Sequence, residues 1–63
     1  MKKTDLVVGE HYLYREDGNP DEPGVEVVLL TKGYDPFLVG VGRILLDGEP
    51  DTFSCFASSL FKL

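Results

Sequence analysis

Two residues of this chain, His11 and Cys55, carry side chains that could act together as a base and a nucleophile. Each is the single residue of its type among the 63. A cysteine nucleophile needs a base and an orienting third group within hydrogen-bond reach. His11 falls on the outward face of a predicted strand, and a lone cysteine next to phenylalanine is more often a small core side chain. We therefore expect a protein that is not an enzyme.

A second candidate for chemistry is the segment Asp17–Asp21, which places oxygen-bearing side chains at alternate positions, as calcium-binding loops do at their start. The pattern then stops, because Glu22 replaces the required glycine and Val28 replaces the final glutamate. The segment predicts a solvated acidic turn. The glycine-rich Gly40–Arg43 lacks the Lys-Ser/Thr of a phosphate-binding loop and indicates strand geometry. We expect no metal and no cofactor.

The charge is strongly acidic, with 6 Lys and Arg against 11 Asp and Glu and a net charge of −5. Five acids and no base lie within Glu16–Glu26, and three more acids lie within Asp47–Asp51. This balance disfavours binding to a phosphate backbone, whereas acidic loops can steer a basic protein. We expect another protein as partner, and a basic one if these loops take part. The candidate partner-binding residues are Glu16, Asp17, Asp21, Glu22, Tyr34 and Phe37.

Short apolar runs separated by glycine and proline predict an all-β chain that forms a single domain over residues 1–63. The run Val25–Thr31 has apolar residues on both faces, which predicts burial on both sides. Glycines at 40 and 42 inside a strand indicate a bulge or a close approach. The predicted strands are His11–Glu16, Val25–Thr31, Phe37–Leu46, Thr52–Phe56 and Phe61–Leu63, with a 3₁₀ turn at Ala57–Leu60 before the last strand.

Five strands of this length bury a common face best by closing into a small barrel, because an open sheet leaves two edges and one bare face. The large rings then have two alternative roles. They fill the core, which we favour in a chain with no Trp and one Met, or they line a peptide-binding groove. These rings are Tyr12, Tyr14, Phe53, Phe56 and Phe61.

Two segments resemble a known class of small barrels. Leu6–Arg15 is similar to the opening strand of Tudor-like and KOW-like domains, and Ile44–Leu63 is similar to their final strands. The resemblance implies a five-stranded SH3-like barrel, and a nucleic-acid-associated barrel is the alternative function. Tudor domains bind methylated side chains in an aromatic cage. The corresponding positions here are Glu16, Val27 and about Leu45, none of which is aromatic.

The opening Lys2–Glu16 also resembles small accessory proteins of tailed bacteriophages, which implies a partner in phage or host machinery. Met1–Lys3 is followed by Thr4 and Asp5 instead of an apolar stretch, so we expect no signal peptide and no membrane span. A single cysteine suits a reducing cytoplasm, which would be that of the host if the protein is phage-encoded. A monomer and a weak homo-oligomer both remain open.

Overall fold

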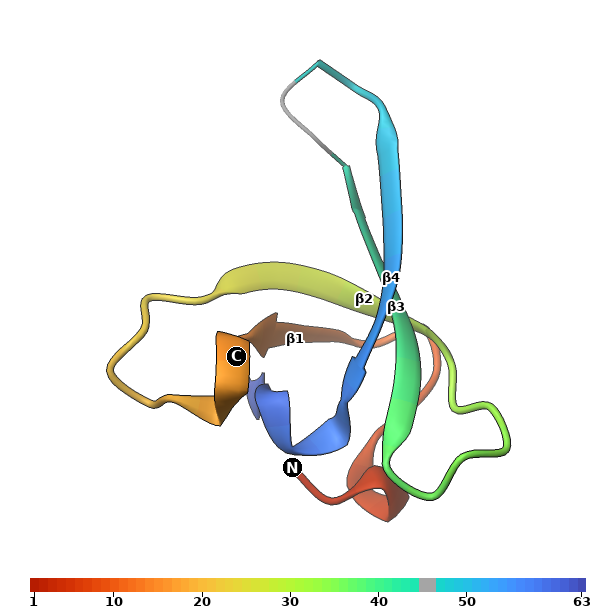
Figure 1. The fold of residues 1–63 in the computed structure, drawn as a ribbon. Helices are drawn as coiled ribbons and strands as arrows, with labels where there is room; N and C mark the ends of the chain where they lie inside the picture. Colours follow the sequence, from red (N-terminus) through yellow and green to blue (C-terminus); the bar gives the residue numbers. More distant parts are fainter. Residues whose placement is uncertain (45–46) are drawn as a thin grey trace.

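The computed structural model describes residues 1–44 and 47–63, and this part of the chain is all-β with short 3₁₀ turns (Figure 1). Among these residues, no helix is long and apolar enough to cross a membrane. The strands are β1 (His11–Tyr14), β2 (Val25–Thr31), β3 (Leu38–Ile44), β4 (Pro50–Phe56) and β5 (Leu60–Lys62), and the turns are η1 (Lys3–Asp5), η2 (Glu16–Gly18) and η3 (Ala57–Ser59).

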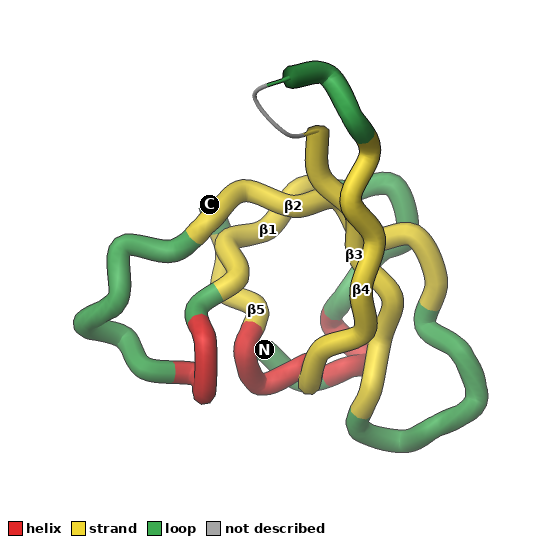
Figure 2. Tube along the Cα trace, turned by 45° about the horizontal axis from the view of Figure 1, so that its top comes forward, coloured by secondary structure: helices red, strands yellow, loops and turns green. Residues whose placement is uncertain are grey.

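The strands form one antiparallel sheet in the order β4-β3-β2-β1-β5. Figure 2 shows β1 and β5 on one side of the molecule and the β3–β4 hairpin on the other, with β2 joining the two. The turn η3 carries the chain from one edge strand, β4, to the other, β5. Within the described residues these two edges do not pair with each other, so closure into a barrel stays a prediction.

The observed elements confirm most of the predicted ones. β2 has the predicted bounds, and η3 lies at the predicted 3₁₀ turn. β1 is shorter than predicted because the chain turns into η2 at Glu16, where Gly18 donates its N–H to the carbonyl oxygen of Arg15. β4 begins two residues earlier than predicted, and β5 begins one residue earlier. The predicted end of the third strand, at 45–46, lies outside the described residues.

The core follows the two-residue period of the strands, in which alternate side chains point to the same face. Val27 and Leu29 point inward from β2, while Leu30 is 47% exposed. The prediction that β2 is buried on both faces is therefore wrong for its second face, which no other element among residues 1–44 and 47–63 covers. The buried apolar side chains are Leu6, Tyr12, Val27, Leu29, Val39, Val41, Cys55, Ala57 and Leu60.

The glycines at 40 and 42 lie opposite a bulge, but the extra residue is in β2 and the close approach is made by side chains of β2, not by another backbone. The β2–β3 register shifts between Leu29 and Thr31, which leaves Leu30 as the extra residue of β2. A Cβ atom on Gly40 would lie 2.8 Å from Cγ2 of Thr31, and one on Gly42 would lie 2.9 Å from Cδ1 of Leu30. Glycine at these positions therefore leaves room for the side chains of Thr31 and Leu30 from β2.

Cys55 is a buried core residue, and burial raises the pKa of its thiol. An unfolded cysteine ionises near pH ~8.5. Above that pH the unfolded state binds fewer protons than the folded state, so the free energy of unfolding falls as pH rises toward the folded pKa. We expect Cys55→Ala to lose less stability than the wild type between pH ~7 and pH ~9.5 in urea titrations.

Tyr14 contributes to the alkaline slope of both proteins in that comparison. Its pKa is raised, first by burial, then by the Glu16 carboxylate and then by Cys55. The difference between the two slopes therefore reports the Cys55 thiol together with its effect on Tyr14. Equal slopes would contradict the assignment of Cys55 as a buried thiol.

Candidate functional site

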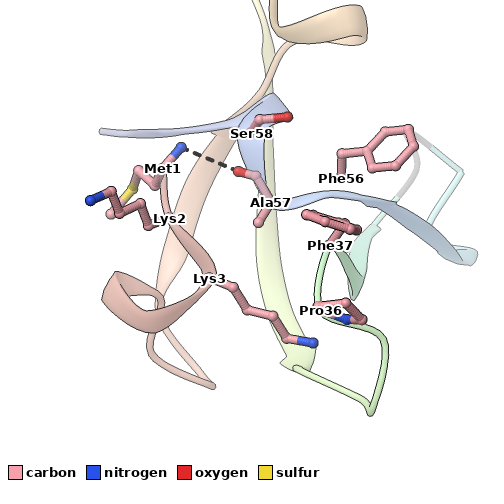
Figure 3. Close-up of a pocket in the computed structure, with 8 residues that line it drawn as sticks. All are labelled: Met1, Lys2, Lys3, Pro36, Phe37, Phe56, Ala57 and Ser58. Atoms are coloured by element: carbon pink, nitrogen blue, oxygen red, sulfur yellow. Dashed lines mark hydrogen bonds between the residues drawn. The ribbon is translucent and has the colours of Figure 1, made fainter.

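A groove of about 430 Å³ opens where the N-terminal segment passes the β2–β3 loop and the end of β4 (Figure 3). Phe37 and Phe56 both line this groove, one from the β2–β3 loop and one from the end of β4. Two lysines of the N-terminal segment also line it: Lys3 reaches the β2–β3 loop beside Pro36, and Lys2 lies on the far side. The lining residues are Met1, Lys2, Lys3, Pro36, Phe37, Phe56, Ala57 and Ser58.

Both rings are open to solvent, with 68% of Phe37 and 57% of Phe56 exposed. The prediction that Phe56 fills the core is therefore wrong. Phe53 and Cys55 take the inward positions of β4, so alternation turns Phe56 outward. Of the other predicted core rings, Tyr12 is buried, Tyr14 and Phe53 pack against the core, and Phe61 is half-buried beneath the Arg15 guanidinium.

The position of Phe37 is fixed by hydrogen bonds of its own loop and of β4. A carboxylate oxygen of Asp35 accepts the backbone N–H groups of Phe37, at 2.7 Å, and Leu38, at 3.1 Å. The N–H of Ala57 donates to the carbonyl oxygen of Phe37 at 2.8 Å, which extends the β3–β4 pairing by one position. Phe37 is thus held by backbone contacts from both walls of the groove.

The N-terminal segment that carries the two lysines is also held in place. The Lys3 ammonium group donates to the carbonyl oxygen of Leu38 at 3.2 Å and to that of Asp35, so it lies beside the β2–β3 loop. The α-amino group of Met1 donates to the carbonyl oxygens of Ala57, at 3.2 Å, and Leu60, at 2.7 Å. These contacts tie the N-terminal segment to the end of β4, and no carboxylate lines the groove.

The six predicted partner-binding residues lie in two separate places. Glu16 and Asp17 belong to η2, and Asp21 and Glu22 follow in the same β1–β2 loop, whereas Phe37 belongs to the β2–β3 loop. These two loops project from opposite sides of the molecule in Figures 1 and 2. The separation follows from β2, because the loops leave its two ends and seven extended residues span roughly 23 Å.

The loop that carries the acids has an internal structure of its own. The carbonyl oxygen of Glu22 accepts the Nε–H of Arg15 at 2.8 Å, and the side chain of Asn19 accepts the N–H of Asp21 at 3.0 Å. Asp17 adopts a positive φ of 56°, which Asp and Asn tolerate better than most residues. We define residues 16–22 as the acidic loop.

Tyr34 shares the β2–β3 loop with Phe37 but does not line the groove. Its ring is fully exposed. The structure therefore places Phe37 in one groove with Phe56, for which the sequence analysis favoured the core over a peptide-binding groove, and Tyr34 does not join them.

The residues considered for catalysis, metal binding or an aromatic cage do not come together in one site. His11 is exposed, and its Nδ1 pairs with Glu26 at 2.8 Å, while Cys55 lies in the core. In residues 1–44 and 47–63, no group of three His, Cys, Asp or Glu side chains could hold a metal ion. Of the positions that correspond to a methyl-reading cage, Glu16 is exposed, Val27 is buried and 45 lies outside the described residues.

The hydrogen bonds from Phe37 and Leu38 to the Asp35 carboxylate make the position of Phe37 in the groove depend on pH. The pKa of the Asp35 carboxyl is lowered, mainly by the N–H of Phe37 and then by that of Leu38. A carboxylate of this kind stabilises the fold above its unfolded pKa of ~3.9, and that contribution is lost as pH falls through the lower folded pKa. We expect the protection of the Phe37 amide proton against exchange, measured by NMR relative to the unfolded-chain rate at the same pH, to fall as pH drops below ~4. Asp35→Asn keeps the acceptor oxygen without titrating, so the same acid transition in that variant would contradict the assignment.

Comparisons of the chain with protein-family models, with curated proteins and with solved structures found no match. The function proposed below therefore rests on the groove and on the distribution of charge.

Proposed function

We propose that this chain is a non-enzymatic protein-interaction module with two contact surfaces, the Phe37–Phe56 groove and the acidic loop. The observation that carries the proposal is the pair of exposed phenylalanines that line one groove. Solvent-exposed aromatic rings gathered in a groove mark a contact surface, because burying them on a partner is favourable. The acidic loop, at the other end of β2, suits a basic protein surface.

The proposed architecture is an SH3-like barrel. Its support is the strand order β4-β3-β2-β1-β5 together with the 3₁₀ turn between β4 and the short β5. Domains of this kind use aromatic grooves to bind extended peptides. The resemblance of the opening segment to phage accessory proteins would place the partner in phage or host machinery.

Association with nucleic acid is the alternative, and the arrangement of the arginines argues against it. The Arg43 guanidinium pairs with the Asp51 carboxylate at 3.1 Å. The Arg15 guanidinium lies over the Phe61 ring, 4.6 Å from its centre. Both arginines of the chain are thus engaged by neighbouring side chains, and its net charge of −5 repels phosphates.

Retention on immobilised nucleic acid separates the two functions. We expect the protein to pass through duplex DNA and single-stranded RNA columns at ~0.15 M salt, because few cations are free to replace counterions. Retention at that salt concentration would overturn the proposal in favour of the nucleic-acid-associated barrel.

Neutralising the acidic loop tests its role in reaching a basic partner. The variant Asp17→Asn, Asp21→Asn, Glu22→Gln removes three charges, and Asn suits the positive φ of position 17. We expect stability within about 0.5 kcal/mol of the wild type and slower association with the partner, with the difference fading above ~0.15 M salt. An unchanged association rate at low salt would reduce the acidic loop to a role in solubility. Stopped-flow fluorescence measures the rate.

A further inference from the structure

We infer that the Phe37–Phe56 groove binds a segment of a protein partner in which apolar side chains are followed by carboxylates. This inference rests on the proposed function, and it assigns to the groove a ligand charge opposite to the one that the acidic loop favours.

The groove combines apolar and cationic surface. Phe37, Phe56 and Pro36 offer ring and aliphatic surface, the Lys3 side chain runs to Pro36, and Lys2 lies on the far side (Figure 3). The nearby Asp35 carboxylate is not among the lining groups and accepts two backbone N–H groups. An apolar side chain would bury the rings, and carboxylates next to it would meet the ammonium groups.

The cationic groups of the groove are held in place before a ligand binds. The Lys3 ammonium group is already held by the carbonyl oxygens of Leu38 and Asp35, and an ammonium group has a third N–H to donate. The Met1 contacts to Ala57 and Leu60 hold the backbone from which Lys2 projects. Groups that are ordered before binding lose less entropy when a ligand arrives. The groove, at about 430 Å³, is also within the size range of ligand pockets.

The net charge of −5 does not oppose this ligand locally. The acidic loop leaves the far end of β2, roughly 23 Å from the β2–β3 loop, which is more than two Debye lengths at physiological salt. The acidic loop therefore adds little to the field at the groove. The nearby Asp35 carboxylate interacts with the Lys3 ammonium group and accepts the N–H groups of Phe37 and Leu38. The two ends of the molecule favour opposite charges, so the module can contact two oppositely charged surfaces at once.

The test is an NMR titration of the whole chain with three matched peptides. Each has a central Phe-Pro-Leu, flanked on both sides by two glutamates, two lysines or two serines. We expect the glutamate peptide to shift the amides of Phe37, Phe56, Ala57 and Ser58, and to bind at least tenfold more tightly than the lysine peptide at low salt. Lys2→Glu should remove most of this preference. Lys62→Glu, which makes the same charge change outside the groove, should keep it.

Each other outcome overturns the inference in a distinct way. Equal binding of the three peptides would show an apolar contact without charge selection. Tighter binding of the lysine peptide would show that the groove prefers a basic ligand. Either result would leave the proposed function standing. Absence of shifts in the groove would remove the peptide site altogether. Concentration-dependent shifts of the same amides without peptide would assign the groove to a second copy of the chain. Shifts caused by a duplex DNA oligonucleotide would overturn the proposed function itself.

Discussion

Replacing Leu29 with alanine is expected to destabilise the protein by about 2–5 kcal/mol, because the side chain is completely buried and its loss leaves a cavity. A chain of 63 residues has a total stability of about 3–9 kcal/mol. The variant should therefore be partly or wholly unfolded at 25 °C. Urea titration followed by circular dichroism measures the change in the free energy of unfolding.

The matched control is the next residue, Leu30, which points to the other face of β2 and is 47% exposed. Leu30→Ala removes the same atoms but should cost only about 1 kcal/mol or less, because its side chain leaves little cavity. A cost for Leu30→Ala equal to that of Leu29→Ala would mean that β2 is covered on both faces, contrary to the single-layer sheet.

The second large effect concerns binding. Phe56→Ser is expected to weaken the affinity for the natural protein partner about 30-fold, which corresponds to the ~2 kcal/mol typical of an aromatic hot spot. Because the ring is 57% exposed, the free energy of unfolding should change little. Isothermal titration calorimetry with the partner measures the affinity, and urea titration measures the stability.

Val8→Ser is the matched control for that variant, since Val8 is 55% exposed and does not line the groove. It should leave the affinity for the partner unchanged. Equal losses for Val8→Ser and Phe56→Ser would indicate a general effect of surface hydrophobicity and would contradict a specific contact at the groove.

The sequence predicts the strands well where one local signal is strong. β2 matches its predicted bounds because Val25–Thr31 is a β-branched run between two turns. The glycines at 40 and 42 indicated a close neighbour, which is present as the side chains of Thr31 and Leu30, but they could not show that the extra residue lies in β2. The start of η2 was missed because Glu16 and Asp17 carry no signal that separates a 3₁₀ turn from a loop.

The candidate site could be predicted only in part. Phe37 was identified, but Phe56 was assigned to the core from ring size, although the alternation of β4 places it opposite Phe53 and Cys55. Lys2 and Lys3 were missed because no local sequence pattern predicts where an N-terminal segment packs. The contacts that bring Lys3 to Leu38 and Met1 to Leu60 join residues far apart in the sequence, and only the folded chain shows them.

The central claim, that the Phe37–Phe56 groove is a protein-binding surface, is tested most directly by photo-crosslinking from position 56. A photoreactive phenylalanine analogue at 56, and separately at 8, is irradiated in the cell that naturally makes the protein. We expect a defined protein adduct from position 56 that survives nuclease treatment, and no such adduct from position 8. A nuclease-sensitive adduct from position 56, or the same adducts from both positions, would contradict the claim.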